Sequence, residues 1–80
     1  MSRFRIPGKD PTTEVFVGWD PPLLTFFGQV YRQGEIIFWV GADRPRQLYE
    51  IDDLQRAMRK HAELTQETRD QLYADKDGSR

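Results

Sequence analysis

The dipeptide Gln33-Gly34, which separates two apolar and aromatic runs at 23–32 and 35–40, constrains this chain most. Glycine supplies the positive φ that a tight hairpin turn demands, so the two runs predict a pair of antiparallel strands. Alternation then divides each run between two faces, and both faces carry bulky apolar side chains. One face must belong to the core, and the other needs a cover or a partner.

The flanking sequence supplies the remaining elements. Residues 14–17 are β-branched and aromatic and predict a strand that Gly18 ends, and Trp19-Asp20-Pro21-Pro22 predicts a rigid connection. Apolar residues recur at helical spacing over 52–62, where Asp52 and Gln55 resemble a capping box, and Thr65 is placed to cap a second helix over 66–74. The expected fold is α+β, a three-stranded antiparallel meander followed by two helices packed on one face.

The length of 80 residues predicts a single domain. We expect a flexible or loosely docked N-terminal arm over 1–12, because this segment contains two prolines and a glycine, then the domain over 13–76 and a frayed end over 77–80. The absence of cysteine excludes disulfides and thiolate metal sites. The sequence also lacks a membrane-spanning apolar run, and its first four residues open no signal peptide, so we expect a cytoplasmic protein without membrane contact.

The sequence contains little that would support catalysis. The only serines, Ser2 and Ser79, stand near the chain ends, and no threonine has an identifiable base. His61, the only histidine, falls beside the apolar stripe of the first predicted helix, where a structural role is expected. Asp52 and Asp53 are the densest carboxylate pair, but adjacent helical side chains diverge by about 100°. We therefore expect no enzyme, no cofactor and no metal site.

A set of basic residues is the first candidate binding site. Three of them recur at i, i+3 and i+4 on the first predicted helix and two precede it, so they could grip phosphates or an acidic protein patch. The alternative is an ordinary solvated helix face, with Asp53 and Glu63 as neutralising neighbours. The five residues are Arg44, Arg46, Arg56, Arg59 and Lys60.

An aromatic set is the second candidate. Phe27 and Tyr31 share a face of one predicted strand, with Trp39 on the hairpin partner and Trp19 beside the prolines as a further member. A strict two-residue turn would pair Tyr31 with Ile36 and turn Trp39 away, so joining the rings requires a longer loop or a bulge. These rings could bind a partner, or the N-terminal arm could cover them as core.

Charge favours a protein over a nucleic acid for the aromatic set. The net charge is −1, and four acidic residues flank the predicted sheet: Glu14, Asp20, Glu35 and Asp43. Negative charge disfavours a phosphate backbone. The aromatic and basic sets could serve one interface, and a homodimer through a sheet edge is a further possibility beside the monomer.

Two likenesses extend this reasoning. Three segments carry the first likeness: Val17-Gly18-Trp19-Asp20-Pro21-Pro22-Leu23-Leu24-Thr25-Phe26-Phe27-Gly28-Gln29-Val30, Phe38-Trp39-Val40-Gly41 and Ile51-Asp52-Asp53-Leu54. They resemble a family of very short proteobacterial proteins, which has no catalytic motif to carry across. In size and character the chain is also similar to the small phage- and plasmid-borne anti-CRISPR inhibitors of type I systems. That likeness implies a non-enzymatic inhibitor from a mobile element, which occupies the surface of a type I surveillance complex, type I-C included, and prevents binding of target DNA. The alternative is a small nucleic-acid-binding regulator.

Overall fold

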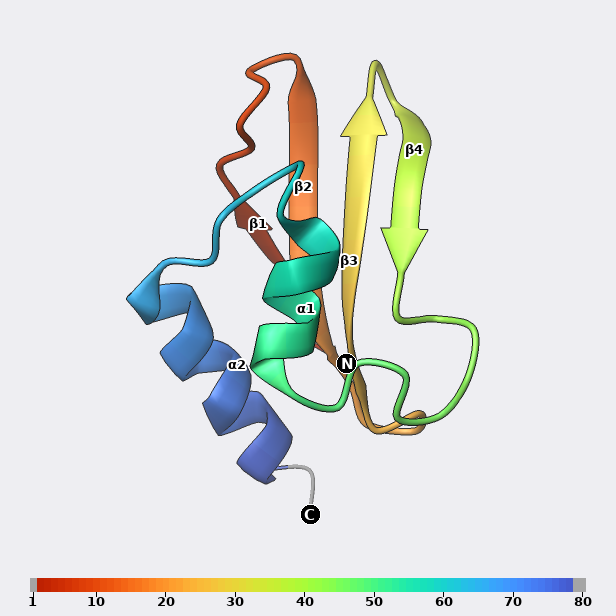
Figure 1. Cartoon of the computed structure of the whole chain (residues 1–80), viewed down its shortest axis with the longest axis vertical. Coiled ribbons are helices and arrows are strands. Elements are labelled where there is room, and N and C mark those ends of the chain that lie inside the picture. The colour runs from red at the N-terminus through yellow and green to blue at the C-terminus, as the bar shows by residue number, and fades with distance from the viewer. Residues whose placement is uncertain (1, 79–80) are drawn as a thin grey trace.

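The computed structural model describes residues 2–78, which form four strands followed by two helices (Figure 1). The strands are β1 (Phe4–Ile6), β2 (Thr13–Asp20), β3 (Thr25–Arg32) and β4 (Glu35–Val40), and the helices are α1 (Ile51–Met58) and α2 (Gln66–Gly78). The sheet order is β1-β2-β3-β4 and every pairing is antiparallel. The α+β class and the meander are confirmed, but the expected three strands are in fact four.

The additional strand, β1, comes from the segment expected to be an arm. Phe4 pairs with Val17 and Ile6 pairs with Val15, so 4–6 extend the sheet beyond β2. Ile6 is buried in the core. A strand of three residues bounded by proline carries too little β-propensity to be recognised, because its stability comes from the strand it joins. Met1 lies outside the described residues.

The hairpin between β3 and β4 turns where it was expected. Gln33 has φ 52° and Gly34 has φ 81°, and positive φ at both central residues is the geometry of a type I′ turn, whose twist matches that of the flanking strands. The rigid connection expected at 19–22 is confirmed only in part: Pro21 and Pro22 lie in a turn over 21–24, in which the Leu24 amide donates to the Pro21 carbonyl at 3.2 Å, whereas Trp19 and Asp20 belong to β2. However, β2 continues through Gly18 to Asp20, and β3 begins only at Thr25.

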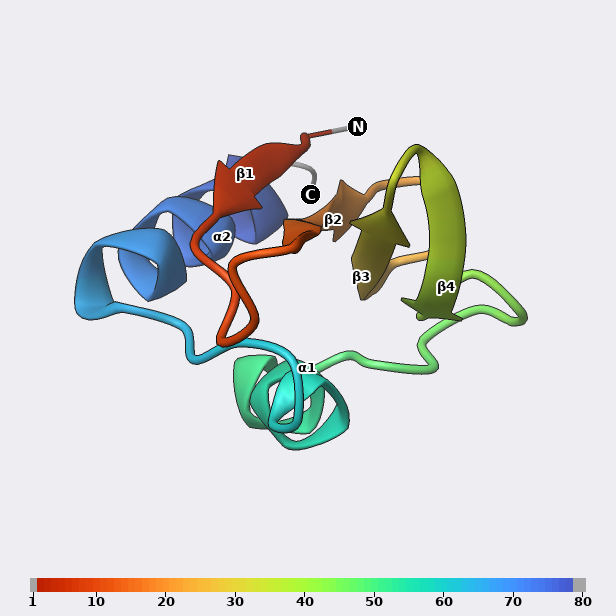
Figure 2. The same ribbon diagram turned by 90° about the horizontal axis from the view of Figure 1, so that it is seen from above.

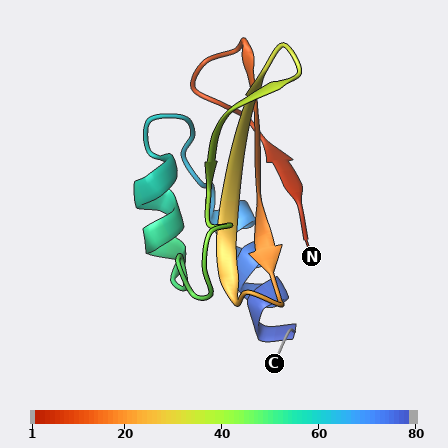
Figure 3. The ribbon, with the colours of Figure 1, turned by 90° about the vertical axis from the view of Figure 1, so that its right-hand side faces the viewer.

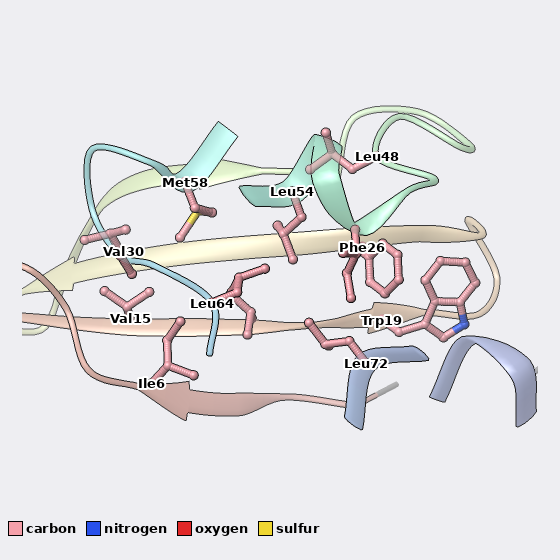
Figure 4. Packing of buried hydrophobic residues seen from close by; sticks show 13 residues of the cluster. Ile6, Val15, Trp19, Phe26, Val30, Leu48, Leu54, Met58, Leu64 and Leu72 are labelled. Atoms are coloured by element: carbon pink, nitrogen blue, oxygen red, sulfur yellow. The ribbon is translucent and has the colours of Figure 1, made fainter. Parts of the chain in front are cut away.

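One face of the sheet, here the inner face, carries the core. Val15, Val17 and Trp19 alternate along β2, opposite Val30, Gly28 and Phe26 of β3. The Trp19 and Phe26 rings meet edge to face at 4.9 Å, and Leu72 of α2 completes that end of the core (Figure 4). Trp19 is only 1% exposed, so its expected place in the aromatic set is wrong.

Both helices contact the sheet, α1 against β3 and α2 against β2 (Figures 2 and 3). Met58 packs directly on Gly28, and a Cβ at this glycine would overlap the Met58 sulfur. The close approach of α1 to β3 therefore requires glycine at 28.

The helix ends differ in part from the prediction. The α1 helix is shorter than the expected 52–62, and Glu50 at its N-cap makes no side-chain capping bond. The predicted capping box does not form, because Gln55 instead accepts from the Leu64 amide at 2.7 Å and donates to the Ala62 carbonyl at 3.3 Å. The Thr65 cap is confirmed, since the Thr68 amide donates to its hydroxyl at 3.2 Å.

The C-terminal segment is helical further than expected. The α2 helix includes Asp77 and Gly78, which were assigned to a frayed end. Ser79 and Arg80 lie outside the described residues.

A lysine from α2 holds this helix against the loop before α1. The Lys76 ammonium lies 3.7 Å from the Tyr49 ring centroid, with the Trp19 and Phe26 rings at 5.9 and 5.7 Å. It also donates to the Tyr49 carbonyl at 2.7 Å and lies 3.9 Å from a Glu50 carboxylate oxygen. The side chain is 12% exposed, so these contacts replace most of its hydration.

Candidate binding surface

A β-bulge in β4 brings the predicted rings to one side of the sheet. Tyr31 pairs with Ile36 as in a strict two-residue hairpin, but the register shifts at the next step, so that Val30 pairs with Phe38 and Gln29 with Trp39. Ile37 is the extra residue. Because cross-strand partners share a face, Trp39 joins Gln29, Tyr31 and Phe27 on the face opposite the core, here the outer face. The condition stated from the sequence, a bulge or a longer loop, is therefore met by a bulge.

The three predicted rings differ in accessibility. Trp39 is 56% exposed and Tyr31 is half-buried, whereas Phe27 is only 4% exposed. The Phe27 ring lies across Gly18, where a Cβ would stand 2.6 Å from its Cζ, and Ser2 is hydrogen-bonded to Trp19 along the same stretch of β2. The Phe27 side chain is therefore enclosed, which does not favour its expected role as a contact residue.

Two further exposed apolar residues stand beside Trp39. Ile36 is 43% exposed and Ile37 is 45% exposed, and both belong to β4, which is an edge strand. We call Ile36, Ile37 and Trp39 the β4 patch. Simple alternation would place Ile36 on the same face as Phe38 and Val40. Ile36 keeps its pairing with Tyr31 on the outer face, and the bulge at Ile37 turns Phe38 to the inner face.

An arginine that sequence reasoning assigned to the arm also lies on the outer face. The Arg3 guanidinium stacks 3.9 Å from the Phe16 ring centroid and 6.0 Å from that of Tyr31, while its Nε donates to Gln29 at 3.3 Å. The Phe16 and Tyr31 rings themselves meet edge to face at 5.8 Å. The alternating apolar residues Phe4 and Ile6 were the only signal that could have brought Arg3 and Arg5 into this face.

The acidic residues expected around the sheet are only partly on this face. Glu14 pairs with Tyr31 and is exposed, so it lies on the outer face beside the rings. Arg5 pairs with Phe16 and is also exposed on the outer face. The exposed charges that flank the rings are therefore of both signs, whereas the sequence had suggested that acidic residues alone flank them.

The five basic residues do not form one cluster. Arg44 and Arg46 lie in the loop before α1, whereas Arg59 and Lys60 follow its last residue, and α1 spans about 12 Å. Arg56 lies on α1 and pairs with Asp53 at 3.3 Å, the neutralising contact that the sequence suggested. The Arg46 guanidinium lies 5.4 Å from the Tyr49 ring centroid.

The part of the basic set on and after α1 also lies apart from the aromatic set. Met58 packs on the inner-face residue Gly28, so α1 contacts the side of the sheet opposite Trp39. A single flat partner surface therefore cannot reach both Trp39 and the basic residues on and after α1, and the expectation that the whole basic set shares one interface with the rings is not supported.

The other candidate groups have partners within the fold. The His61 ring stacks on Phe38 with centroids 4.7 Å apart, in agreement with its expected structural role. Asp52 and Asp53 each hold a separate arginine, Arg69 at 3.2 Å and Arg56 at 3.3 Å. Among residues 2–78 no group of three histidine or acidic side chains is placed to bind a metal ion.

Within residues 2–78, Asp10 is the one titratable group whose pKa the fold clearly shifts. The Thr12 amide and hydroxyl donate to one of its carboxylate oxygens at 2.9 and 2.7 Å, and Arg32 reaches the other at 3.0 Å. These donors, Thr12 first, hold the pKa of Asp10 below its ordinary value of 3.8. The carboxylate thereby fixes the turn between β1 and β2.

Neither helix in the described part of the chain is long and apolar enough to cross a membrane. Comparison with protein-family models, with curated proteins and with solved structures finds no match.

Proposed function

We propose that this chain is a non-enzymatic binding protein whose contact surface is the β4 patch together with Tyr31 and Arg3. The observation that carries the proposal is the exposure of Trp39, Ile36 and Ile37 side by side on one strand. Binding hot spots are enriched in tryptophan, tyrosine and arginine, and exposed apolar residues that gather in one place mark interaction surfaces.

The energetic contribution of Trp39 can be approximated from its exposure. A tryptophan buries 150–250 Å² when it packs, so the 56% that is exposed leaves about 100 Å² to be covered by a partner. At about 25 cal/mol per Å² this area contributes about 2.5 kcal/mol, or about sixtyfold in affinity. The residue is large enough to be the anchor of an interface.

In its specific form, the proposal is that the chain is an anti-CRISPR inhibitor from a phage or another mobile element, acting in the cytoplasm. It would occupy the surface of a type I surveillance complex, with type I-C as the subtype to test first, and prevent target DNA from binding. The likeness in size and character to such inhibitors supports this target. The β4 patch supports the more general proposal of protein binding.

A nucleic-acid-binding regulator is the second candidate, and one observation favours it. Arg3 and Arg5 lie on the same face as Phe16, Tyr31 and Trp39, and cations beside exposed rings suit a stacked single strand. The net charge of −1 for the whole chain favours a protein partner instead.

The test uses purified type I-C surveillance complex and labelled target DNA. Wild-type protein is expected to lower DNA binding by the complex, Trp39→Ala to need about fiftyfold more protein for the same inhibition, and Tyr73→Ala to match wild type. Tyr73 is the matched control because it is an aromatic residue on α2 with 44% exposure. Equal inhibition by all three proteins would refute the β4 patch as the contact surface.

The basic residues and the second candidate are tested in parallel. If alanine replacement of Arg56, Arg59 and Lys60 leaves inhibition unchanged, these residues play no part in binding. Direct binding of the chain to single-stranded DNA that falls steeply with rising salt would favour the regulator, because neutralised phosphates release counterions. No inhibition of any type I complex would refute the anti-CRISPR proposal and leave protein binding to be tested with other targets.

A further inference from the structure

The two edges of the sheet differ in how they are protected. β1 is three residues long, carries the exposed Arg5 and is followed at once by Pro7, features that discourage another strand from pairing there. β4 is six residues long and, although it carries the bulge at Ile37, it has neither a proline nor a charged residue between Ile36 and Val40. Within residues 2–78 no strand pairs with the far side of β4. Its backbone is therefore available to a further strand.

Charge is distributed along this edge in a way that suits a second copy of the chain. The exposed Glu35 stands at the start of β4, and the loop after the end of β4 carries the exposed Asp43, Arg44 and Arg46, with a net charge of +1. Figure 1 shows that this loop projects beyond β4 on the side away from β3. When two β4 strands run antiparallel, the acidic start of each faces the basic end of the other.

We propose that the chain forms a homodimer in which β4 pairs antiparallel with β4 of a second copy, joining two four-stranded sheets into one of eight strands. The contact is isologous, so each favourable charge pairing occurs twice. The two β4 patches become neighbours across the new pairing, which covers part of Ile36, Ile37 and Trp39. The outer faces then form one continuous surface that remains open to other molecules.

The inference does not depend on the proposed target, because a dimer can form whether or not the protein inhibits a surveillance complex. Molar mass is measured by sedimentation equilibrium over a range of protein concentrations from low micromolar upward. The wild-type chain is expected to approach twice its 9.5 kDa mass as concentration rises. Inhibition is measured separately, so failure of one proposal is distinguishable from failure of the other.

Charge reversals identify the interface. Glu35→Arg and Arg44→Glu are each expected to weaken dimerisation about tenfold, because each creates two like-charge contacts, and the double variant should restore wild-type affinity. Lys60→Glu, which makes the same charge change as Arg44→Glu at a distant exposed position, should have no effect. These residues are exposed, so the variants should fold.

Ile37→Lys tests the apolar part of the edge. It should lower the dimer affinity, whereas Tyr73→Lys, at a residue with 44% exposure against 45% for Ile37, should not. A wild-type chain that stays monomeric at the highest concentration overturns the proposal. A dimer that survives Ile37→Lys and both single charge reversals unchanged overturns it as well, since it must form elsewhere.

Discussion

The substitution Lys76→Met tests whether the ammonium held by the aromatic rings stabilises the fold. Methionine keeps most of the aliphatic packing of lysine but removes the charge. The hydrogen bond from Lys76 to the Tyr49 carbonyl, 2.7 Å long, is of the charge-assisted kind worth about 1.5–3 kcal/mol. The Tyr49 ring at 3.7 Å adds about 1 kcal/mol of cation–π attraction.

The neighbouring ion pair adds little to this sum, and desolvation reduces it. Glu50 is 63% exposed, so the 3.9 Å ion pair with Lys76 contributes little. Methionine also avoids the desolvation cost of a lysine whose side chain is 12% exposed. We expect Lys76→Met to lower the free energy of unfolding by about 2 kcal/mol.

Urea unfolding followed by far-UV circular dichroism measures the change, and tryptophan fluorescence provides a local signal because Trp19 lies 5.9 Å from the ammonium. The exposed Lys60→Met is the control and should leave stability unchanged. A double-mutant cycle with Tyr49→Leu should assign about 1 kcal/mol to the contact between the two side chains. If Lys76→Met is as stable as wild type, desolvation offsets the contacts and the reasoning is wrong.

Three further predictions concern stability and register. Gly28→Ala should lower the free energy of unfolding by about 1–3 kcal/mol, because its Cβ would overlap the Met58 sulfur. Adding Met58→Ala should recover part of this lost stability, and the absence of any recovery would contradict the proposed packing. Asp10→Asn should lower the free energy of unfolding at neutral pH. Because the folded pKa of Asp10 is lowered, the stability difference between variant and wild type should be constant above about pH 4 and shrink as pH falls through the folded pKa. A stability difference that does not change with pH would argue against the role of the carboxylate. Deletion of Ile37 should remove the bulge, while Phe38 still pairs with Val30 and Trp39 with Gln29. Acrylamide should then quench the fluorescence of Trp39 in the variant as it does in the parent chain. A loss of that quenching would show that the register of β4 had moved.

Local signals in the sequence were sufficient for the hairpin, the second helix cap and the fold class. Gln33-Gly34 predicts its turn because few residues other than glycine adopt positive φ without strain, and Thr65 caps because its hydroxyl reaches an unpaired helical amide. These features depend on two to four neighbouring residues. They can be recognised without knowledge of the rest of the fold.

The binding surface depended on contacts between distant segments. The bulge that turns Trp39 outward arises from the packing of β4 against β3, and the residue types at 35–40 do not predict it. Phe27 is enclosed because β2 carries glycine at 18. Arg3 reaches Phe16 only because 4–6 join the sheet as β1. Each outcome needs the tertiary structure, which alternation within one strand does not contain.

The strand order has a consequence for how the chain folds. Each strand of the meander pairs with the strand next to it in sequence, so the sheet can form by short loop closures, which favours rapid folding. The core closes later, because Leu72 reaches Trp19 only after more than 50 intervening residues have been placed. During synthesis the four strands leave the ribosome before α2, and the apolar face around Trp19 stays uncovered until the last helix emerges.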